Sequence, residues 1–376
     1  MAGIYIHIPF CKSKCRYCDF TSYTDKYAIC DAYMACVYRE MQMYKDRLKN
    51  YVFNTVYFGG GTPSTIDPKF IYGALKEAKK CFRIAPDAEI TIEMNPGTVT
   101  KDKIEYYKKI GINRFSVGLQ TGVDAQLFNL GRIHRAQDFA SCASYLRGTN
   151  FSADVMIGLQ DQTAEDVQKT IEFAVGCGAS HVSMYALTPE DGTPMYTDYL
   201  NGLLPDGDET AEMYEAGYQK LKELGFTRYE VSNFSKKGKE SRHNINYWKR
   251  GEYIGFGVDA SSFIDDMRFT NTKDMDEYTK CIISGHLPVV FSERIGAEKA
   301  RFEFIMLGLR MACGINLNEY AAKFGGDFES DFQEAIAKNR DYLVFEGGNV
   351  RIRDEYLYVQ NTILMDFLEY EEDEEE

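Results

Sequence analysis

Short apolar runs alternate with longer amphipathic segments through the first two-thirds of this chain, and this alternation limits the possible folds. Runs rich in β-branched and aromatic residues predict strands, and segments with a helical repeat predict helices. The predicted strands are 4–8, 55–58, 89–94, 114–119, 152–157 and 181–187. The predicted helices are 28–49, 68–81, 101–110, 136–147 and 164–176. This α/β pattern implies parallel strands with crossover helices, in either a partial barrel or an open sheet.

Distinctive residues follow six successive predicted strands. These are a cysteine loop after the first, a glycine run after the second, and Glu93, Gln120, Gly158 and Tyr185 at or near the ends of the others. Parallel strands bring their C-terminal ends to one rim, where α/β barrels keep their active sites. We therefore expect residues far apart in the sequence to meet at one mouth.

The pattern changes after residue 205. A helix over 207–224 and a strand over 227–234 precede a basic loop at 236–242. From about 276 to 367 the chain reads as mostly helical, with a hairpin over 344–350, which is typical of a smaller winged-helix-like domain. We expect domains at 1–270 and 276–367, followed by a disordered acidic tail at 369–376.

The charge balance excludes some classes of protein. The chain has 57 acidic and 43 basic residues, a net charge of −14, and such a surface repels nucleic-acid backbones. No apolar stretch of membrane-spanning length and no basic, apolar leader appears, so we expect a cytoplasmic protein without a membrane span. Ten cysteines then indicate reduced thiols. The seven scattered ones are predicted to be buried apolar filler: Cys30, Cys36, Cys81, Cys142, Cys177, Cys281 and Cys313.

The remaining three cysteines form a compact motif. Cys11, Cys15 and Cys18 supply three soft ligands within eight residues. On a [4Fe–4S] cluster, three ligands leave one iron open. Zinc, with Asp19, His7 or a distant residue as the fourth ligand, is the rival, although zinc sites usually show two ligand pairs. Three unligated thiols are the third possibility, and spacing alone leaves all three open.

The surroundings of the motif resemble the radical SAM superfamily. An aromatic residue, Tyr17, precedes the last cysteine, the run 5–10 precedes the motif, and 59–63 is similar to the glycine strip that binds the amino group of S-adenosylmethionine (SAM). The resemblance implies a partial (β/α)6 TIM-like barrel and a [4Fe–4S] cluster on the three cysteines, with SAM on the open iron. It also implies a one-electron donor such as a flavodoxin or ferredoxin, because one electron from the cluster cleaves SAM.

Within that superfamily, the chain is most similar to oxygen-independent coproporphyrinogen III dehydrogenases and their sister group, the HemW-type haem chaperones. The matching stretches include 93–97, 118–121, 130–134 and 154–159. The resemblance implies that Tyr5, Gly60 and Glu93 contact the cluster-bound SAM. It further matches five residues to a second SAM site of the dehydrogenases: Gly61, Thr62, Gln120, Arg132 and Asp154. The plainer alternatives are a helix cap for Glu93, a surface ion pair for Arg132, and core histidines for His7 and His134.

Two features favour the chaperone branch over the dehydrogenases. Phe20 stands where the dehydrogenases carry a fourth cysteine, and the first strand begins without their N-terminal extension. The resemblance thus implies a carrier that binds haem and delivers it to an acceptor haemoprotein. The alternative is a dehydrogenase that decarboxylates coproporphyrinogen III propionates.

The segment His243-Asn244-Ile245-Asn246-Tyr247-Trp248 matches the haem-binding motif proposed for the chaperone branch. Imidazole is a common haem-iron ligand, and Tyr247 and Trp248 offer flat surface for a porphyrin face. We expect His243 in a polar loop that reaches the barrel mouth, with the two aromatic residues forming one wall of a flat pocket. Nearby basic residues would meet the propionates: Lys236, Lys237, Lys239 and Arg242. The alternative is a loop histidine beside a buried Tyr-Trp pair.

Overall fold

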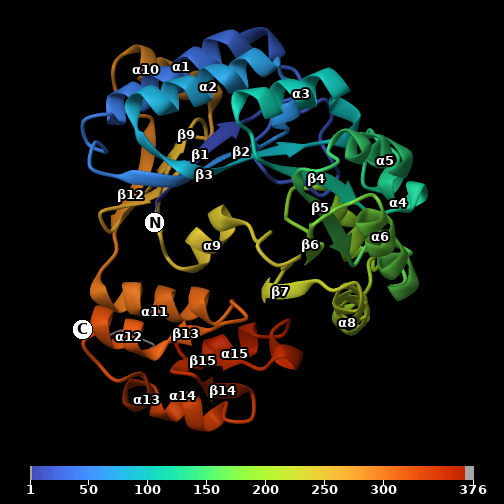
Figure 1. Cartoon of the computed structure of the whole chain (residues 1–376), viewed down its shortest axis with the longest axis vertical. Coiled ribbons are helices and arrows are strands. Elements are labelled where there is room, and N and C mark those ends of the chain that lie inside the picture. The colour runs from blue at the N-terminus through green and yellow to red at the C-terminus, as the bar shows by residue number, and fades with distance from the viewer. Residues whose placement is uncertain (1, 369–376) are drawn as a thin grey trace.

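The computed structural model describes residues 2–368, and its main feature is a curved twelve-stranded sheet (Figure 1). Six neighbouring strands run parallel in chain order. They are β1 (Ala2–Ile8), β2 (Val52–Gly60), β3 (Arg83–Met94), β4 (Arg114–Gln120), β5 (Asn150–Ile157) and β6 (His181–Ala186). Their apolar side chains form the main core, and all seven residues of β4 are buried. Burial on both faces explains why these strands read as continuous apolar runs.

Further strands extend this parallel set at both ends. On one side, β9 (Glu252–Phe256) pairs parallel with β1, and β10 (Ser261–Ile264), β11 (Met267–Asn271) and β12 (Val289–Arg294) continue antiparallel. On the other side, β8 (Asn233–Ser235) and β7 (Thr227–Glu230) follow β6. The order runs from β12 to β7, so the sheet is open and the barrel is partial.

The crossover helices lie on the outer face of the sheet (Figure 1). They are α1 (Cys30–Tyr44), α2 (Pro68–Cys81), α3 (Lys101–Ile110), α5 (Ala136–Tyr145), α6 (Ala164–Gly176) and α8 (Gly207–Glu223), with the short α4 (Asp124–Asn129) and α7 (Pro194–Leu200) between them. Local signals set their ends. Thr100 caps α3 and Thr163 caps α6 through side-chain oxygens, and Gly111 ends α3 at φ 105°.

A smaller unit with its own core follows the large sheet. Its helices are α11 (Ala297–Gly308), α12 (Leu317–Phe324), α13 (Phe328–Asp331), α14 (Gln333–Lys338) and α15 (Asn361–Met365). Its small sheet joins β13 (Ile315–Asn316), β15 (Asn349–Ile352) and β14 (Leu343–Glu346). The rings of Tyr320, Phe328 and Phe332 pack in its core. Helices with a small hairpin confirm the winged-helix-like C-terminal domain, including the hairpin expected over 344–350.

Several local expectations were wrong. The strand expected over 227–234 is two antiparallel strands, β7 and β8. The segment expected as a loop is helix α9 (Arg242–Trp248), which packs on β1 and β2. Helix α10 (Met275–Ile283) packs against α1, and β12 belongs to the large sheet, so we propose a domain boundary near residue 295 in place of 276.

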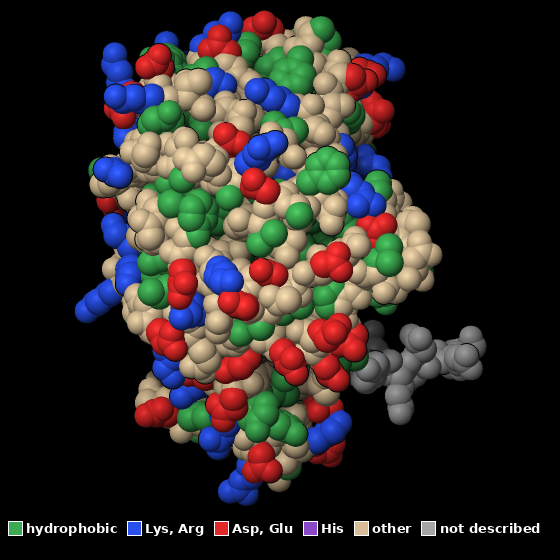
Figure 2. Space-filling view, turned by 90° about the vertical axis from the view of Figure 1, so that its right-hand side faces the viewer, with side chains coloured by type: hydrophobic (Ala, Val, Ile, Leu, Met, Phe, Trp, Pro, Cys, Tyr) green, Lys and Arg blue, Asp and Glu red, His purple; other side chains and the backbone are tan. Residues whose placement is uncertain are grey.

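The cysteines and the surface complete the description. All ten cysteines are free. Of the seven expected to be buried filler, Cys177 and Cys281 are only partly buried and Cys313 is exposed, so the expectation was wrong for these three. Acidic and basic side chains intermingle on the face shown in Figure 2. Between residues 2 and 368 the structure contains no helix that is both long and apolar enough to traverse a bilayer. The acidic tail expected at 369–376 lies outside the described residues.

Candidate functional site

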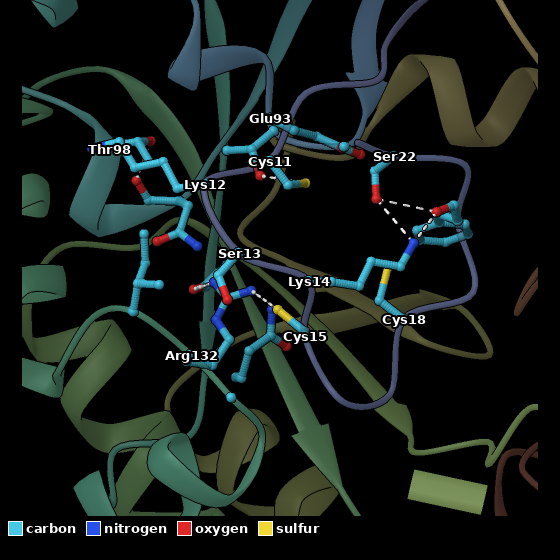
Figure 3. A pocket seen from close by; sticks show the side chains of 18 of the residues that line it. Cys11, Lys12, Ser13, Lys14, Cys15, Cys18, Ser22, Glu93, Thr98 and Arg132 are labelled. Atoms are coloured by element: carbon cyan, nitrogen blue, oxygen red, sulfur yellow. Dashed lines mark hydrogen bonds between the residues drawn. The ribbon is translucent and has the colours of Figure 1, made fainter. Parts of the chain in front are cut away.

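The cysteine loop leaves the end of β1 and is closed at its base by backbone hydrogen bonds. The amide of Cys11 donates to the carbonyl of Tyr23 at 3.0 Å, and the amide of Tyr23 donates to the carbonyl of Pro9 at 2.7 Å. Cys11, Cys15 and Cys18 are partly exposed and surround one opening (Figure 3). The loop is therefore a defined turn that presents three thiols to the barrel mouth.

The far side of this loop is held by contacts with distant segments. Arg16 donates its amide to the carbonyl of Leu130 at 3.0 Å, and its guanidinium pairs with Asp198 of α7 at 2.7 Å. The amide of Met195 donates to the carbonyl of Arg16 at 3.0 Å. Two segments from other barrel units thus hold the loop in place over the sheet.

The glycine run at the end of β2 lies directly against the start of the cysteine loop. The amide of Gly61 donates to the carbonyl of Ile8, and that of Thr62 to the carbonyl of Phe10, both at 2.9 Å. Gly60 has φ 109°, and a Cβ there would come within 2.6 Å of the His7 ring. Glycine is needed at this position because both the backbone conformation and the space exclude a side chain.

His7 itself supports this glycine run. It accepts a hydrogen bond from the Tyr5 hydroxyl at 3.0 Å through Nδ1, and its Nε2 donates to the carbonyl of Thr21 at 2.9 Å. The ring is buried, and burial lowers its pKa. The histidine therefore packs as a neutral spacer under the glycine run, which agrees with the core reading.

Two carboxyl groups face the mouth from neighbouring strands. Glu93, at the end of β3, accepts a hydrogen bond from the Tyr57 hydroxyl at 2.7 Å, and burial raises its pKa to about 7. Asp154 of β5 accepts hydrogen bonds from the Ser116 hydroxyl at 3.1 and 3.2 Å, and burial raises its pKa too. These carboxyl groups are poised to gain from a cationic ligand, because a nearby positive charge favours their ionised form.

Arg132 and Gln120 line the same mouth. Arg132 donates to the carbonyl of Gly118 at 2.9 Å, its Nη1 lies 3.6 Å from the sulfur of Cys15, and its buried Nε has no partner among residues 2–368. Gln120 adopts φ 70° at the end of β4 and accepts a hydrogen bond from Tyr185 at 3.1 Å. A strained non-glycine residue and an unpaired guanidinium nitrogen are features that cluster at functional sites.

One cavity of about 170 Å³ joins these groups. The sequence-predicted residues that line it are Cys11, Cys15, Cys18, Gly60, Gly61, Thr62, Glu93, Gln120, Arg132, Asp154 and Tyr185. Tyr5 is the exception, since its ring lines a second cavity. Sequence reasoning missed Tyr57 and Ser116, which position the two carboxyl groups. Both lie inside strands that read as ordinary sheet, so no local signal distinguished them.

The donor set fits an iron–sulfur cluster. Within residues 2–368, no three Cys, His, Asp or Glu side chains converge on a point where a single metal ion would bind. Ligands of a cubane bind different iron atoms and therefore stand further apart than ligands of one ion. Three thiols on one loop, with carboxyl groups and a guanidinium across the cavity, suit a thiolate-bound cluster and a ligand with both cationic and anionic groups.

The segment around His243 lies away from this cavity, and the loop expectation for it was wrong. His243 is only 1% exposed, with Nδ1 2.7 Å from the Thr55 hydroxyl and Nε2 2.8 Å from the Tyr247 hydroxyl. Its ring stacks on Tyr57 at 4.8 Å. Burial lowers its pKa to about 3, so the imidazole is neutral. Both ring nitrogens already have partners.

Tyr247 and Trp248 do not form the single flat pocket wall that was expected. Tyr247 lines the second cavity, whereas Trp248 lines a different one with Gly308 and Cys313. Two of the four basic residues upstream have other partners. Lys236 donates to the carbonyl of Leu224, and Arg242 pairs with Asp87 at 3.4 Å. Tyr247 and Trp248 therefore line two separate cavities.

Comparison with known proteins places these features in a family. The radical SAM superfamily model matches residues 5–174, and the HemN C-terminal domain model matches 296–357. The solved structure of coproporphyrinogen III oxidase (HemN) from Escherichia coli, a radical SAM enzyme, superposes with a TM-score of 0.86 at 17% identity. The match covers 97% of this chain and 89% of that chain, and it confirms the fold.

Sequence relatives give the finer placement. The heme chaperone HemW of Bacillus subtilis is 32% identical over 342 residues, which cover 89% of this chain and 90% of that protein. The heme chaperone HemW of Escherichia coli is 37% identical over 262 residues, 69% of each chain. That of Synechocystis is 34% identical over 325 residues, covering 83% of this chain and 78% of the relative. This chain therefore belongs to the HemW family of the radical SAM superfamily.

Proposed function

We propose that this chain is a haem chaperone that binds haem and passes it to an acceptor haemoprotein. In this proposal it carries a [4Fe–4S] cluster on Cys11, Cys15 and Cys18, with SAM bound beside the cluster. The observation that carries the cluster and SAM sites is the convergence of the three thiols, the glycine run and Glu93 on one cavity. The names of the HemW relatives support haem as the cargo.

The chain's own groups have distinct tasks in this site. The cysteine thiolates would hold the cluster, which supplies one-electron reduction of SAM when both are bound. The backbone at Gly60 and Gly61 allows close approach of a ligand, and Glu93 would meet its ammonium group. Arg132 would donate to a carboxylate from the opposite wall. The same proposal assigns Asp154 and Gln120 to a second SAM.

Coproporphyrinogen III decarboxylation is the alternative, and it has less support. The fold is shared with HemN, so the fold does not distinguish the two functions. Phe20 stands at the position where the dehydrogenases carry a fourth cysteine. Its side chain is 65% exposed. A surface phenylalanine offers neither a ligand nor a proton donor there.

The test is anaerobic reconstitution followed by four assays on the same preparation. We expect about four irons per chain, saturable binding of about one haem, and transfer of that haem to an apo-haemoprotein. We expect no consumption of coproporphyrinogen III with SAM and a reductant. Multiple turnover of coproporphyrinogen III would move the protein to the dehydrogenase class, and absence of haem binding would refute the chaperone proposal.

A further inference from the structure

A second cavity, of about 570 Å³, lies between the inner face of the large sheet and helix α11. Its walls carry four aromatic rings, from Tyr5 of β1, Tyr247 of α9, Tyr253 of β9 and Phe263 of β10. Helix α11 closes the other side with Met306 and Leu307. In Figure 1, α9 lies between the sheet and α11. The cavity is thus largely apolar and large enough for an extended flat ligand.

Two guanidinium groups give this apolar space a polar end. Arg250 and Arg268 both bind the buried carboxylate of Glu303, each at 2.8 Å. Arg268 also reaches Glu293 at 3.2 Å, and Arg250 lies 3.7 Å from the exposed Asp266. The remaining charged group of the lining, Asp259, lies at the exposed rim.

One donor in this cluster lacks a partner. The Nη2 atom of Arg250 is buried and has no hydrogen-bond partner among the described residues. A buried, unpaired guanidinium N–H is costly, and native structures rarely keep one without a ligand or a water. Its natural acceptor is a carboxylate, which the planar guanidinium binds through paired N–H groups.

We propose that this cavity is the haem site and that Arg250 Nη2 donates to a haem propionate. The inference rests on the proposed haem-chaperone function and gives it a location. A tetrapyrrole has two broad apolar faces and carboxylates along one edge. Four aromatic rings and a methionine match the faces, and the arginine pair matches the edge.

The position of Tyr247 connects this site with His243. Tyr247 lines the cavity, and its hydroxyl lies 2.8 Å from Nε2 of the buried His243. The imidazole reaches a haem in this cavity only when Tyr247 rotates away. Tyr5, which lines this cavity, and Glu93, which lines the SAM cavity, both lie close to Gly59: a Cβ there would come within 3.0 Å of the Tyr5 ring and 3.2 Å of the Glu93 carboxylate. The haem would therefore lie close to the SAM cavity.

The cavity lined by Trp248 is the rival location. It is smaller, about 170 Å³, and is bordered by Lys249, Glu319 and the exposed Cys313. It offers two aromatic rings, those of Trp248 and Phe304, and no arginine in its lining. A bulky residue placed in each cavity separates the two locations experimentally.

The experiment titrates the reconstituted full-length protein with haem and follows the haem absorption and the quenching of protein fluorescence. Met306→Trp fills the proposed site, and Cys313→Trp fills the rival cavity from its exposed edge as the matched control. Arg250→Gln removes the unpaired donor, and Arg250→Lys keeps the charge without the planar fork. Iron content and SAM binding are measured on every variant to show that the first cavity is intact.

We expect Met306→Trp to abolish saturable haem binding and Arg250→Gln to weaken it about tenfold, the loss of one charge-assisted hydrogen bond. Arg250→Lys should recover part of that loss, and Cys313→Trp should bind as the wild type. Wild-type affinity in both Met306→Trp and Arg250→Gln overturns this site while leaving the chaperone function standing. Loss of binding in Cys313→Trp alone moves the haem to the Trp248 cavity. If the wild-type protein binds no haem, the proposed function itself fails.

Discussion

Replacing Glu93 by Gln separates the stability cost of a buried carboxyl group from its use in ligand binding. Burial raises the pKa of Glu93 from 4.5 to about 7, against the opposing hydrogen bond from Tyr57. An acid whose pKa is higher in the folded state holds more protons there than in the unfolded chain. Its contribution to folding is therefore complete below about pH 4.5 and is lost as the pH rises to about 7.

The magnitude follows from that pKa difference. At about 1.36 kcal/mol per pH unit, a rise from 4.5 to about 7 corresponds to about 3 kcal/mol of destabilisation above pH 7. Gln keeps the acceptor for Tyr57 but removes the ionisation. Glu93→Gln should then raise the thermal midpoint at pH 8 by several degrees, at roughly 2 °C per kcal/mol for a large domain, and should change little at pH 4.5.

The same substitution, Glu93→Gln, should weaken SAM binding although it stabilises the fold at pH 8. SAM carries an ammonium and a sulfonium group, and loss of an ionised hydrogen-bond partner costs about tenfold to a hundredfold in affinity. Equilibrium binding to the anaerobically reconstituted protein measures this, alongside thermal unfolding at pH 4.5 and pH 8. The iron content should stay at the wild-type level, because Glu93 is not among the proposed cluster ligands.

Glu230 supplies a matched control. Its carboxyl group is fully buried near β7 and β8, burial raises its pKa to about 7, and it does not line the SAM cavity. Glu230→Gln should stabilise the protein at pH 8 in the same way and leave SAM affinity unchanged. Wild-type SAM affinity in Glu93→Gln would show that the charge of Glu93 does not hold SAM. An unchanged thermal midpoint at pH 8 in both variants would refute the burial argument.

Three further predictions concern the cluster, the glycine run and the buried helix. Replacing any one cysteine of the loop by Ser should remove most of the iron, whereas Cys142→Ser, in the core, should retain it, as iron analysis and absorbance will show. Gly60→Val should abolish SAM binding with the cluster largely retained, because φ 109° and the His7 ring leave no room for a side chain. His243→Ala should lower the free energy of unfolding by about 2 kcal/mol, since it leaves the buried Thr55 hydroxyl unpaired. Urea denaturation measures that loss, and unchanged stability would mean that the hydrogen bond contributes nothing.

Local sequence signals predicted the parallel half of the sheet and its helices. The bounds of α3 and α6 match the predicted segments at both ends, because their capping residues Thr100 and Thr163 act within one turn. The meeting of the proposed cluster and SAM residues at one cavity could also be predicted. Each follows its own strand, and parallel strands with crossover helices must place those ends on one rim.

Sequence reasoning failed where long-range partners decide the structure. The segment 243–248 reads as a polar loop because it holds a histidine and two asparagines. Its helix is buried because the amide of His243 donates to Glu89 and the ring meets Thr55, 188 positions earlier in the chain. Strand β12 was missed for the same reason. It is held in the sheet by pairing with β11, and its mostly exposed side chains give no alternating apolar pattern that would predict a strand.

The sequence by itself determined where the parallel strands and their helices lie along the chain, and it determined the cysteine motif and the glycine run, because these depend on neighbours within a few residues. Only the tertiary structure decided which cavities the aromatic side chains enter. Tyr247 and Trp248 are adjacent in the chain but face different spaces, since successive residues of a helix point about 100° apart. The packing of α9 against the sheet and α11 sets the direction of each ring, and that packing depends on residues from the whole length of the chain.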